Sequence, residues 1–149
     1  MIETDTTLTD SLAQALETMA FLTIMPLEED TAAPEKTISA EISFTGPKNG
    51  TIQILAGLDL CRILAENIGA LTEVNDETCY DALKELSNVT CGLLLPMLAS
   101  SGGDVFDVTV PAVKTGDDSP GWDEFVEQPN SCILNIEGFL VATRLIMKE

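Results

Sequence analysis

The sequence predicts an α+β fold in which helices pack on a mostly antiparallel sheet. Three observations favour this class. An apolar run at helical spacing comes first, alternating segments joined by short turns follow it, and a longer helix interrupts the strands. The 149 residues suit a single domain, 1–149, long enough to bury a core. Hydrophobic residues make up 45% and charged residues 21%, the balance of a globular chain rather than a disordered one.

The first half of the chain is expected to form one helix and one hairpin. A cap at Thr9 or Asp10 begins a helix whose apolar residues continue at helical spacing until Pro26 closes the run. Residues 37–44, TISAEISF, alternate between apolar and polar types, the period of a half-buried strand. Residues 51–56 form a second strand, and the intervening GPKNG has the composition of a hairpin turn.

The second half adds helices first and strands later. In order, we expect a short helix over 58–68, a longer helix capped by Asn75 and kinked or ended by Pro96, a strand over 105–110 that ends at Pro111, an acidic loop over 112–130, and a hairpin of strands 131–136 and 139–147. Trp122, the single tryptophan, lies in the acidic loop. It either anchors a partner or caps the edge of the core.

A weak internal repeat indicates a duplicated half-domain or, alternatively, two helices that merely end alike. LTIMP at 22–26 resembles LLLP at 93–96, and strands joined in hairpins follow each segment. Matching the two prolines pairs Ala15 with Glu85 and Thr18 with Asn88, so only the second copy would carry an acid and an amide.

The composition excludes several classes of function. Seven Lys and Arg against 25 Asp and Glu give a net charge of −18, which disfavours nucleic acid and anionic membranes as partners. The chain has no histidine, which excludes Ser-His-Asp and Cys-His catalysis by this chain alone. The four cysteines form no CxxC pair, and we expect each to be a small buried hydrophobe rather than a metal ligand or redox centre.

The sequence also predicts where the protein works. The amino terminus, MIETDTTLTD, is acidic and polar, unlike a secretory signal or a transit peptide. No apolar run reaches the roughly 18 residues that a membrane-spanning helix needs. We therefore expect a cytoplasmic protein with reduced thiols.

The longer helix carries the most informative pattern of the sequence. At about 100° per residue, Asp81, Glu85, Asn88 and Gly92 lie within about 60° of one another, while the leucines of the same helix point elsewhere. A solvated helix face is the ordinary explanation of such a polar stripe. However, asparagine and glycine are both poor residues for a helix interior, and glycine costs about 1 kcal/mol relative to alanine. The bare glycine suits the close approach of another chain.

These residues make the sequence resemble the CheC, CheX and FliY family of chemotaxis phosphatases. The family pattern is Asp or Ser, three residues, Glu, two residues, Asn, 22 residues and Pro. Asp81, Glu85, Asn88 and Pro111 stand at those spacings in this sequence. One intact site, a degenerate first helix and the length of the chain are similar to the CheX branch rather than to CheC, which usually carries two sites.

The resemblance implies a substrate and a role for each residue of the stripe. The substrate would be the phosphoaspartate of a CheY-like receiver domain, which brings its own Mg²⁺, so this chain needs no cofactor. Asn88 would position the attacking water, since an amide both accepts and donates hydrogen bonds without titrating. Glu85 would pair with the lysine near the receiver's active site and dock the helix. Asp81 and Gly92 would belong to the partner-binding surface: Asp81 would tune the site or contact the partner, and Gly92 would leave room for the receiver's backbone or for packing beneath the helix. Pro111 would be structural.

Other interpretations of the same residues stay open. The resemblance also implies a homodimer formed through edge strands. A non-catalytic adaptor that binds receivers, like a flagellar switch domain, is the alternative to the phosphatase. A carboxylate metal site at Asp81 and Glu85 is a third class, but Ca²⁺ takes six or more oxygen ligands and the sequence supplies too few nearby. We expect no metal site in this chain.

Overall fold

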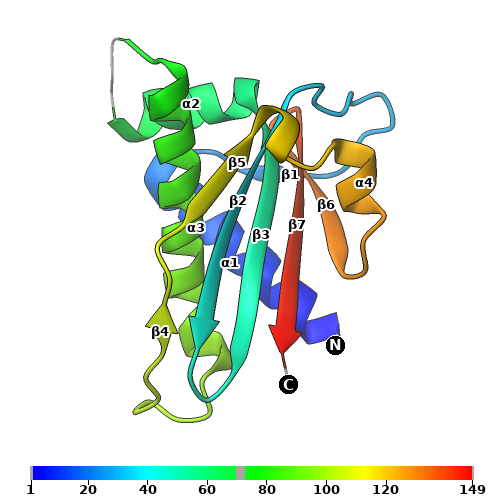
Figure 1. Cartoon of the computed structure of the whole chain (residues 1–149). Coiled ribbons are helices and arrows are strands. Elements are labelled where there is room, and N and C mark those ends of the chain that lie inside the picture. The colour runs from blue at the N-terminus through cyan, green and yellow to red at the C-terminus, as the bar shows by residue number, and fades with distance from the viewer. Residues whose placement is uncertain (1, 70–72, 149) are drawn as a thin grey trace.

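The structure, a computed structural model, describes residues 2–69 and 73–148 (Figure 1). Residues 1, 70–72 and 149 of the expected domain lie outside this part. The elements in chain order are α1 (Ile2–Ala20), β1 (Ile24–Met25), β2 (Thr37–Thr45), β3 (Asn49–Gly57), α2 (Leu58–Gly69), α3 (Asp76–Leu98), β4 (Asp107–Val108), β5 (Ala112–Thr115), the 3₁₀ turn η1 (Gly116–Asp118), α4 (Trp122–Val126), β6 (Ser131–Ile136) and β7 (Phe139–Lys148).

The seven strands of the described residues form one antiparallel sheet, which confirms the predicted α+β class. The strand order is β1-β6-β7-β3-β2-β4, and β5 also pairs with β2. Both predicted hairpins are present as β2–β3 and β6–β7. Glu137 and Gly138 turn the second hairpin with φ angles of 50° and 100°, the positive values that a tight two-residue hairpin turn requires.

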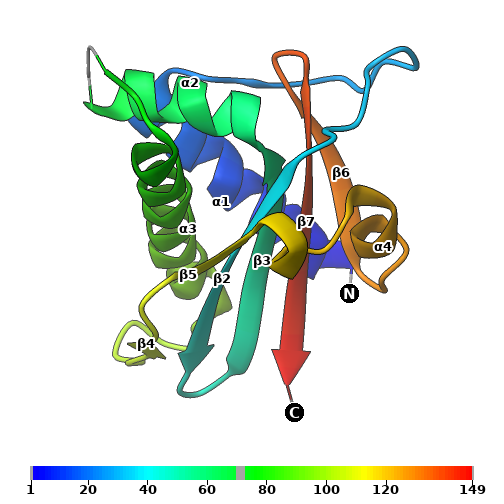
Figure 2. The same ribbon diagram turned by 45° about the horizontal axis from the view of Figure 1, so that its top comes forward.

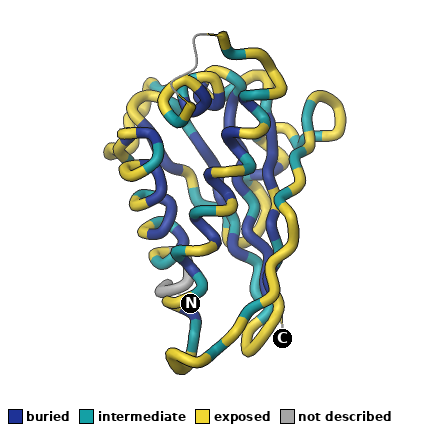
Figure 3. Tube along the Cα trace, turned by 90° about the vertical axis from the view of Figure 1, so that its left-hand side faces the viewer, coloured by how far each residue is buried: buried dark blue, intermediate teal, exposed yellow. Residues whose placement is uncertain are grey.

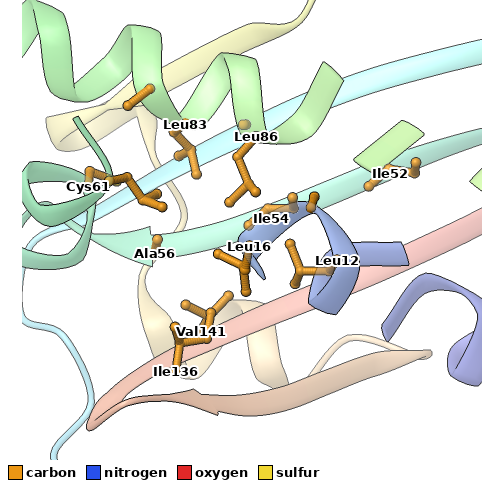
Figure 4. Packing of buried hydrophobic residues seen from close by; sticks show 14 of the residues in the cluster. Leu12, Leu16, Ile52, Ile54, Ala56, Cys61, Leu83, Leu86, Ile136 and Val141 are labelled. Carbon is orange, nitrogen blue, oxygen red and sulfur yellow. The ribbon is translucent and has the colours of Figure 1, made fainter. Parts of the chain in front are cut away.

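The helices α1 and α3 pack on one face of the sheet and bury the main core between helix and strand (Figures 1 and 2). Figure 3 shows the same layering, because the buried parts of the helices face the buried parts of the strands. The close view in Figure 4 shows leucines from both helices meeting aliphatic residues of β3 and β7. The residues labelled there include Leu12, Leu16, Leu83, Leu86, Ile52, Ile54 and Val141, all of them buried.

The opposite face of the sheet carries a smaller cluster under α4. Leu55 and Ala142 alternate with core residues along β3 and β7, so their side chains point to this second face. Phe125 of α4 is buried against them, and Trp122 packs at the margin. The prediction of a loop over 112–130 is therefore wrong in part, because this range contains the strand β5 and the short helix α4. The helix α4 forms because its apolar side chains cover the second cluster. Trp122 caps the edge of this cluster.

The end of α1 differs from the prediction that Pro26 closes it. Phe21 adopts a left-handed conformation with φ of 57°, and the Leu22 N–H donates to the Leu16 carbonyl at 3.2 Å. A left-handed residue directly after the last helical turn is a common way to end a helix, although glycine usually occupies that position. The helix therefore ends at Ala20, and the short strand β1 precedes Pro26. The predicted start at Thr9 or Asp10 is also wrong, since the helix already runs from Ile2.

The proline of α3 neither ends nor interrupts its helix. Pro96 lies inside α3, which continues to Leu98. Leu94 and Leu98 are both buried, so packing on either side of the proline keeps the last turn in place. The strand expected over 105–110 shrinks to Asp107–Val108, because β2 pairs first with β4 and then with β5.

The burial patterns of α1 and α3 favour a different register for the predicted internal repeat from the one that the prolines suggest. Ala15, expected to correspond to Glu85, is fully buried, whereas Glu85 is exposed. Moving the alignment by one residue restores the match, because residues 10–17 and 81–88 then have the same order of buried and exposed positions. In that register Gln14 matches Glu85, and Glu17 matches Asn88. The shifted register replaces Thr18 by Glu17 as the counterpart of Asn88, although Thr18 is exposed as well, and duplication itself stays a prediction.

In the described part of the chain, no helix is both long enough and apolar enough to cross a membrane. The four cysteines are free thiols, of which Cys61, Cys79 and Cys91 are buried. Burial raises the pKa of Cys61 to about 12 and that of Cys91 to about 11. These two thiols therefore stay protonated near neutral pH, as expected of small core residues rather than of nucleophiles.

Candidate functional site

The start of α3 is fixed by the cap that the sequence predicts. The Thr78 backbone N–H donates to Asn75 Oδ1 at 3.0 Å, and the Asn75 N–H donates to Thr78 Oγ1 at 3.0 Å. These reciprocal bonds form a capping box, which satisfies two backbone donors at the helix end. Asp76 and Glu77 occupy the first turn, where the helix dipole favours negative charge.

The rotation of α3 about its axis is fixed by its buried leucines. Leu83, Leu86 and Leu94 are at most 2% exposed and contribute to the main core. The opposite side of the helix faces solvent. The residues of the predicted stripe, Asp81, Glu85, Asn88 and Gly92, are all exposed there. The structure therefore places the acid and the amide outward, one turn apart on a rigid element.

A shallow hollow of about 440 Å³ brings α3 together with the segment that follows it. This return segment, residues 99–111, runs from the end of α3 back along the helix to β5 (Figure 1). Asp81, Lys84, Glu85 and Asn88 line one side of the hollow, and Thr109, Val110 and Pro111 line the other. Pro111 therefore lies opposite Asn88, although 22 residues separate the two in the sequence.

The side chains of Glu85 and Asn88 have no partner within residues 2–69 and 73–148. No hydrogen bond or ion pair in this described part involves either carboxylate or amide. Asp81 differs, because its Oδ1 lies 4.0 Å from Lys84 Nζ. Both of these side chains are largely solvated, so the ion pair adds little stability. The acid and the amide are thus left available for a ligand, while Asp81 is partly neutralised.

Gly92 lies in open space on the same face of α3. A Cβ atom built at this position would meet no other atom within 4 Å, apart from neighbouring backbone of its own helix. The glycine is therefore not required by packing beneath the helix. Its cost to helix stability therefore has no return from packing within the described chain.

A second hollow of about 490 Å³ continues the surface beyond Gly92 toward the end of α3. Leu95 and Pro96 line it from the helix, and Asp104 and Phe106 line it from the return segment. Asp104 Oδ2 accepts a hydrogen bond from the Ser100 N–H at 2.7 Å. This bond and those from Ser101 lower the pKa of Asp104, so its charge holds the loop in shape.

A smaller cavity of about 200 Å³ lies under α4 on the far face of the sheet. Three of its polar side chains are joined by hydrogen bonds, because Gln53 donates to Glu41 at 2.8 Å and accepts from Arg144 at 3.1 Å. The described residues contain no group of three or more acidic or cysteine side chains placed to hold a metal ion. Lys84 lines the same hollow as Asp81 and Glu85, so its ammonium would repel a cation there.

Two residues that line the hollow were not predicted from the sequence as functional candidates. In the sequence Lys84 stands between two residues of the stripe and gives no sign of a functional role. Its spacing of three residues from Asp81 does permit the ion pair that the structure shows. Val110 resembles a buried strand residue in the sequence, yet it is 86% exposed. Only the path of the return segment, which no local pattern determines, brings it to the site.

Comparison with known families decides the relationship of this chain. The sequence model of the family described as chemotaxis phosphatase CheX matches residues 38–121, more than half of the 149-residue chain. The chain belongs to the CheX family. The matched range contains α3 and Pro111 but not α1. A search of curated proteins gave no match.

Solved structures share the CheX fold over nearly their whole length. A CheX protein from Desulfovibrio desulfuricans is 19% identical, with a TM-score of 0.73 over 98% of this chain and 99% of the other. A CheX from Vibrio vulnificus is 22% identical, with a TM-score of 0.68 over 95% and 93%. CheX in a CheX–CheY–BeF₃–Mg²⁺ complex from Borrelia burgdorferi is 18% identical, with a TM-score of 0.67 over 96% of each chain. At these identities the likeness concerns the fold.

Proposed function

We propose that this protein stimulates hydrolysis of the phosphoaspartate on a CheY-like receiver domain in chemotaxis signalling. The observation that carries the proposal is the pair of exposed, unpartnered side chains Glu85 and Asn88, held one turn apart beside a hollow. Membership of a family of chemotaxis phosphatases supports the reaction. The relative from Borrelia burgdorferi, solved in a complex with CheY, supports the class of partner.

Asn88 is proposed to position the attacking water. Phosphoryl transfer depends mainly on placement of the nucleophile and on stabilisation of charge. The side-chain oxygen of Asn88 accepts a hydrogen bond from water, and its NH₂ group donates one. Because the amide does not titrate, it can do this in a chain without histidine. The Mg²⁺ that stabilises the phosphoryl charge is expected on the receiver, not on this chain.

Glu85 is proposed to dock the receiver so that Asn88 lies over the phosphoryl group. A carboxylate that makes no internal ion pair can accept a charge-assisted bond from the receiver's lysine. When this ion pair forms on docking, both charged groups lose bound water and depend on each other as partners. The position of the pair therefore fixes the register of the complex. Asp81 would contact the partner at the edge, with Lys84 reducing the repulsion between this acidic protein and the phosphoryl group.

Assembly is a separate part of the proposal. The outer edge of β6 pairs with β1 only at Asn135 and Ile136, so residues 131–134 present an edge that no described strand covers. An uncovered edge can pair with a second copy of the chain. We propose a homodimer through edge strands, and light scattering at several protein concentrations tests its mass.

The activity is tested with a purified receiver from the same genome, phosphorylated on its aspartate by a small phosphodonor in Mg²⁺. Loss of receiver phosphate is followed after the donor is removed, with and without this protein. Catalytic amounts should accelerate the loss over the receiver's own rate. Binding without acceleration, with every receiver of the genome, supports the non-catalytic adaptor instead.

A further inference from the structure

We infer that Val110 is an apolar docking residue that contacts the receiver domain beside its phosphorylated aspartate. This inference rests on the proposed function and extends it to a residue outside the acid-amide pair. Val110 is 86% exposed and lines the same hollow as Glu85 and Asn88. An isolated exposed valine needs no explanation on most surfaces. Here the side chain lies on the wall of the hollow that faces Glu85 and Asn88, where a receiver docked on that pair would cover it.

The backbone around Val110 is fastened on both sides. The Thr109 N–H donates to the Ser43 carbonyl at 2.9 Å, and the Ser43 N–H donates to Thr109 Oγ1 at 3.0 Å. On the other side, Pro111 disfavours helical dihedral angles at Val110, and Ala112 begins the pairing of β5 with β2. The valine is thus presented outward by a segment held to the sheet.

The return segment is also anchored further back. The ring of Phe106 packs edge-to-face on Phe44 of β2, with centroids 6.1 Å apart. Phe106 is partly buried against the main core. A rigid apolar contact loses little conformational entropy when a partner covers it. Pro111 therefore has a role beyond ending a strand, because it helps to hold Val110 in the docking position.

An apolar contact can also bind a receiver that the negative charge of this protein does not attract. This protein has a net charge of −18, so long-range attraction to an acidic receiver is not available. Burial of a valine against an apolar side chain adds affinity that does not depend on charge. The partner surface that fits is therefore an apolar residue adjoining the phosphorylated aspartate and the lysine.

The test compares Val110→Ser with Val105→Ser. Val105 is a matched control, because it is 77% exposed on the same return segment but lines neither hollow along α3. Affinity is measured for the receiver loaded with beryllium fluoride and Mg²⁺, and KM and kcat are measured with phosphorylated receiver. We expect Val110→Ser to raise Kd and KM about five- to thirtyfold with kcat nearly unchanged, and Val105→Ser to change neither by more than about twofold.

Two further readouts separate docking from a structural effect. Val110→Ile should keep wild-type affinity, and all three variants should unfold at the wild-type temperature. The effect of Val110→Ser should persist between about 0.05 and 0.5 M salt, whereas an ionic contact weakens over that range. Equal Kd values for the Val110→Ser and Val105→Ser variants overturn the inference while leaving the proposed function intact. Tight binding without hydrolysis in the wild type overturns the phosphatase and not the docking role. Absence of any binding overturns both.

Discussion

Asn88 and Pro111 line the same hollow, the first on α3 and the second where the return segment joins β5. The 22 residues between them comprise the end of α3 and the return segment, which runs back beside the helix. The amide is exposed on a helix whose other face is sealed into the core. The helix thus separates a face that packs in the core from a face that is open to a partner.

Substitution of Glu85 should weaken binding as well as hydrolysis. Glu85→Ala removes the carboxylate that pairs with the receiver, so we expect Kd to rise about tenfold or more and the stimulated rate at low receiver concentration to fall further. Stability should change by less than about 0.5 kcal/mol, because the side chain is exposed. Calorimetric titration with beryllium fluoride-loaded receiver measures the affinity. Wild-type affinity in Glu85→Ala would remove its docking role.

Gly92→Ala should make the free protein more stable but weaken its binding to the receiver. The new Cβ meets nothing within 4 Å, and alanine favours a helix interior by about 1 kcal/mol. The thermal midpoint should rise by about 2–5 °C. If a receiver approaches at this position, the methyl group raises Kd for the receiver several-fold. Thermal unfolding and receiver binding are measured on the same sample, and higher stability with unchanged binding would contradict the role of Gly92 as a partner contact.

Thr90→Val should stabilise the core. Thr90 is fully buried in α3, and its Oγ1 has no hydrogen-bond partner among the described residues. Removing an unsatisfied hydroxyl while keeping a branched side chain is expected to gain about 1 kcal/mol. Ser87→Ala is the matched control, because the Ser87 hydroxyl donates to the Leu83 carbonyl at 3.0 Å. Denaturant unfolding should separate the two variants, and a loss of stability in Thr90→Val would argue against an unsatisfied hydroxyl.

The buried thiols predict an alkaline limit to stability. In the folded state the pKa of Cys61 is raised from 9.0 to about 12 and that of Cys91 to about 11, by burial. Above pH 9 the unfolded chain loses protons that the folded chain keeps, so the free energy of unfolding falls between about pH 9 and 12. Unfolding in urea across this range measures the slope. Replacing both cysteines with alanine should flatten it, and an unchanged slope would assign the effect to other groups.

Local signals explain the elements that the sequence predicts well. The cap at Asn75 works through atoms three residues apart, and the hairpins depend on alternation and on turn residues next to one another. Such interactions are complete within a short segment, so their chemistry is legible in the sequence. The outward stripe of α3 was predictable for the same reason, since helical spacing alone separates Glu85 and Asn88 from the leucines.

The failures come from interactions between distant segments. Phe21 ends α1 in a left-handed conformation that a phenylalanine seldom adopts, whereas the sequence drew attention to Pro26. Packing of Leu94 and Leu98 carries α3 through Pro96. Val110 looks like a strand residue but is exposed, because the pairing of β2 passes from β4 to β5 at that point. None of these outcomes has a cause within a short segment, so no local sequence pattern predicts it.

The most direct test of the proposed mechanism is the rate of receiver dephosphorylation with Asn88→Ala, compared with Glu17→Ala. Glu17 is the matched control because it occupies the corresponding exposed position on α1. We predict that Asn88→Ala loses stimulated hydrolysis about a hundredfold or more while its receiver affinity stays within about twofold, and that Glu17→Ala keeps both. Full stimulation by Asn88→Ala would contradict the positioning of water by this amide.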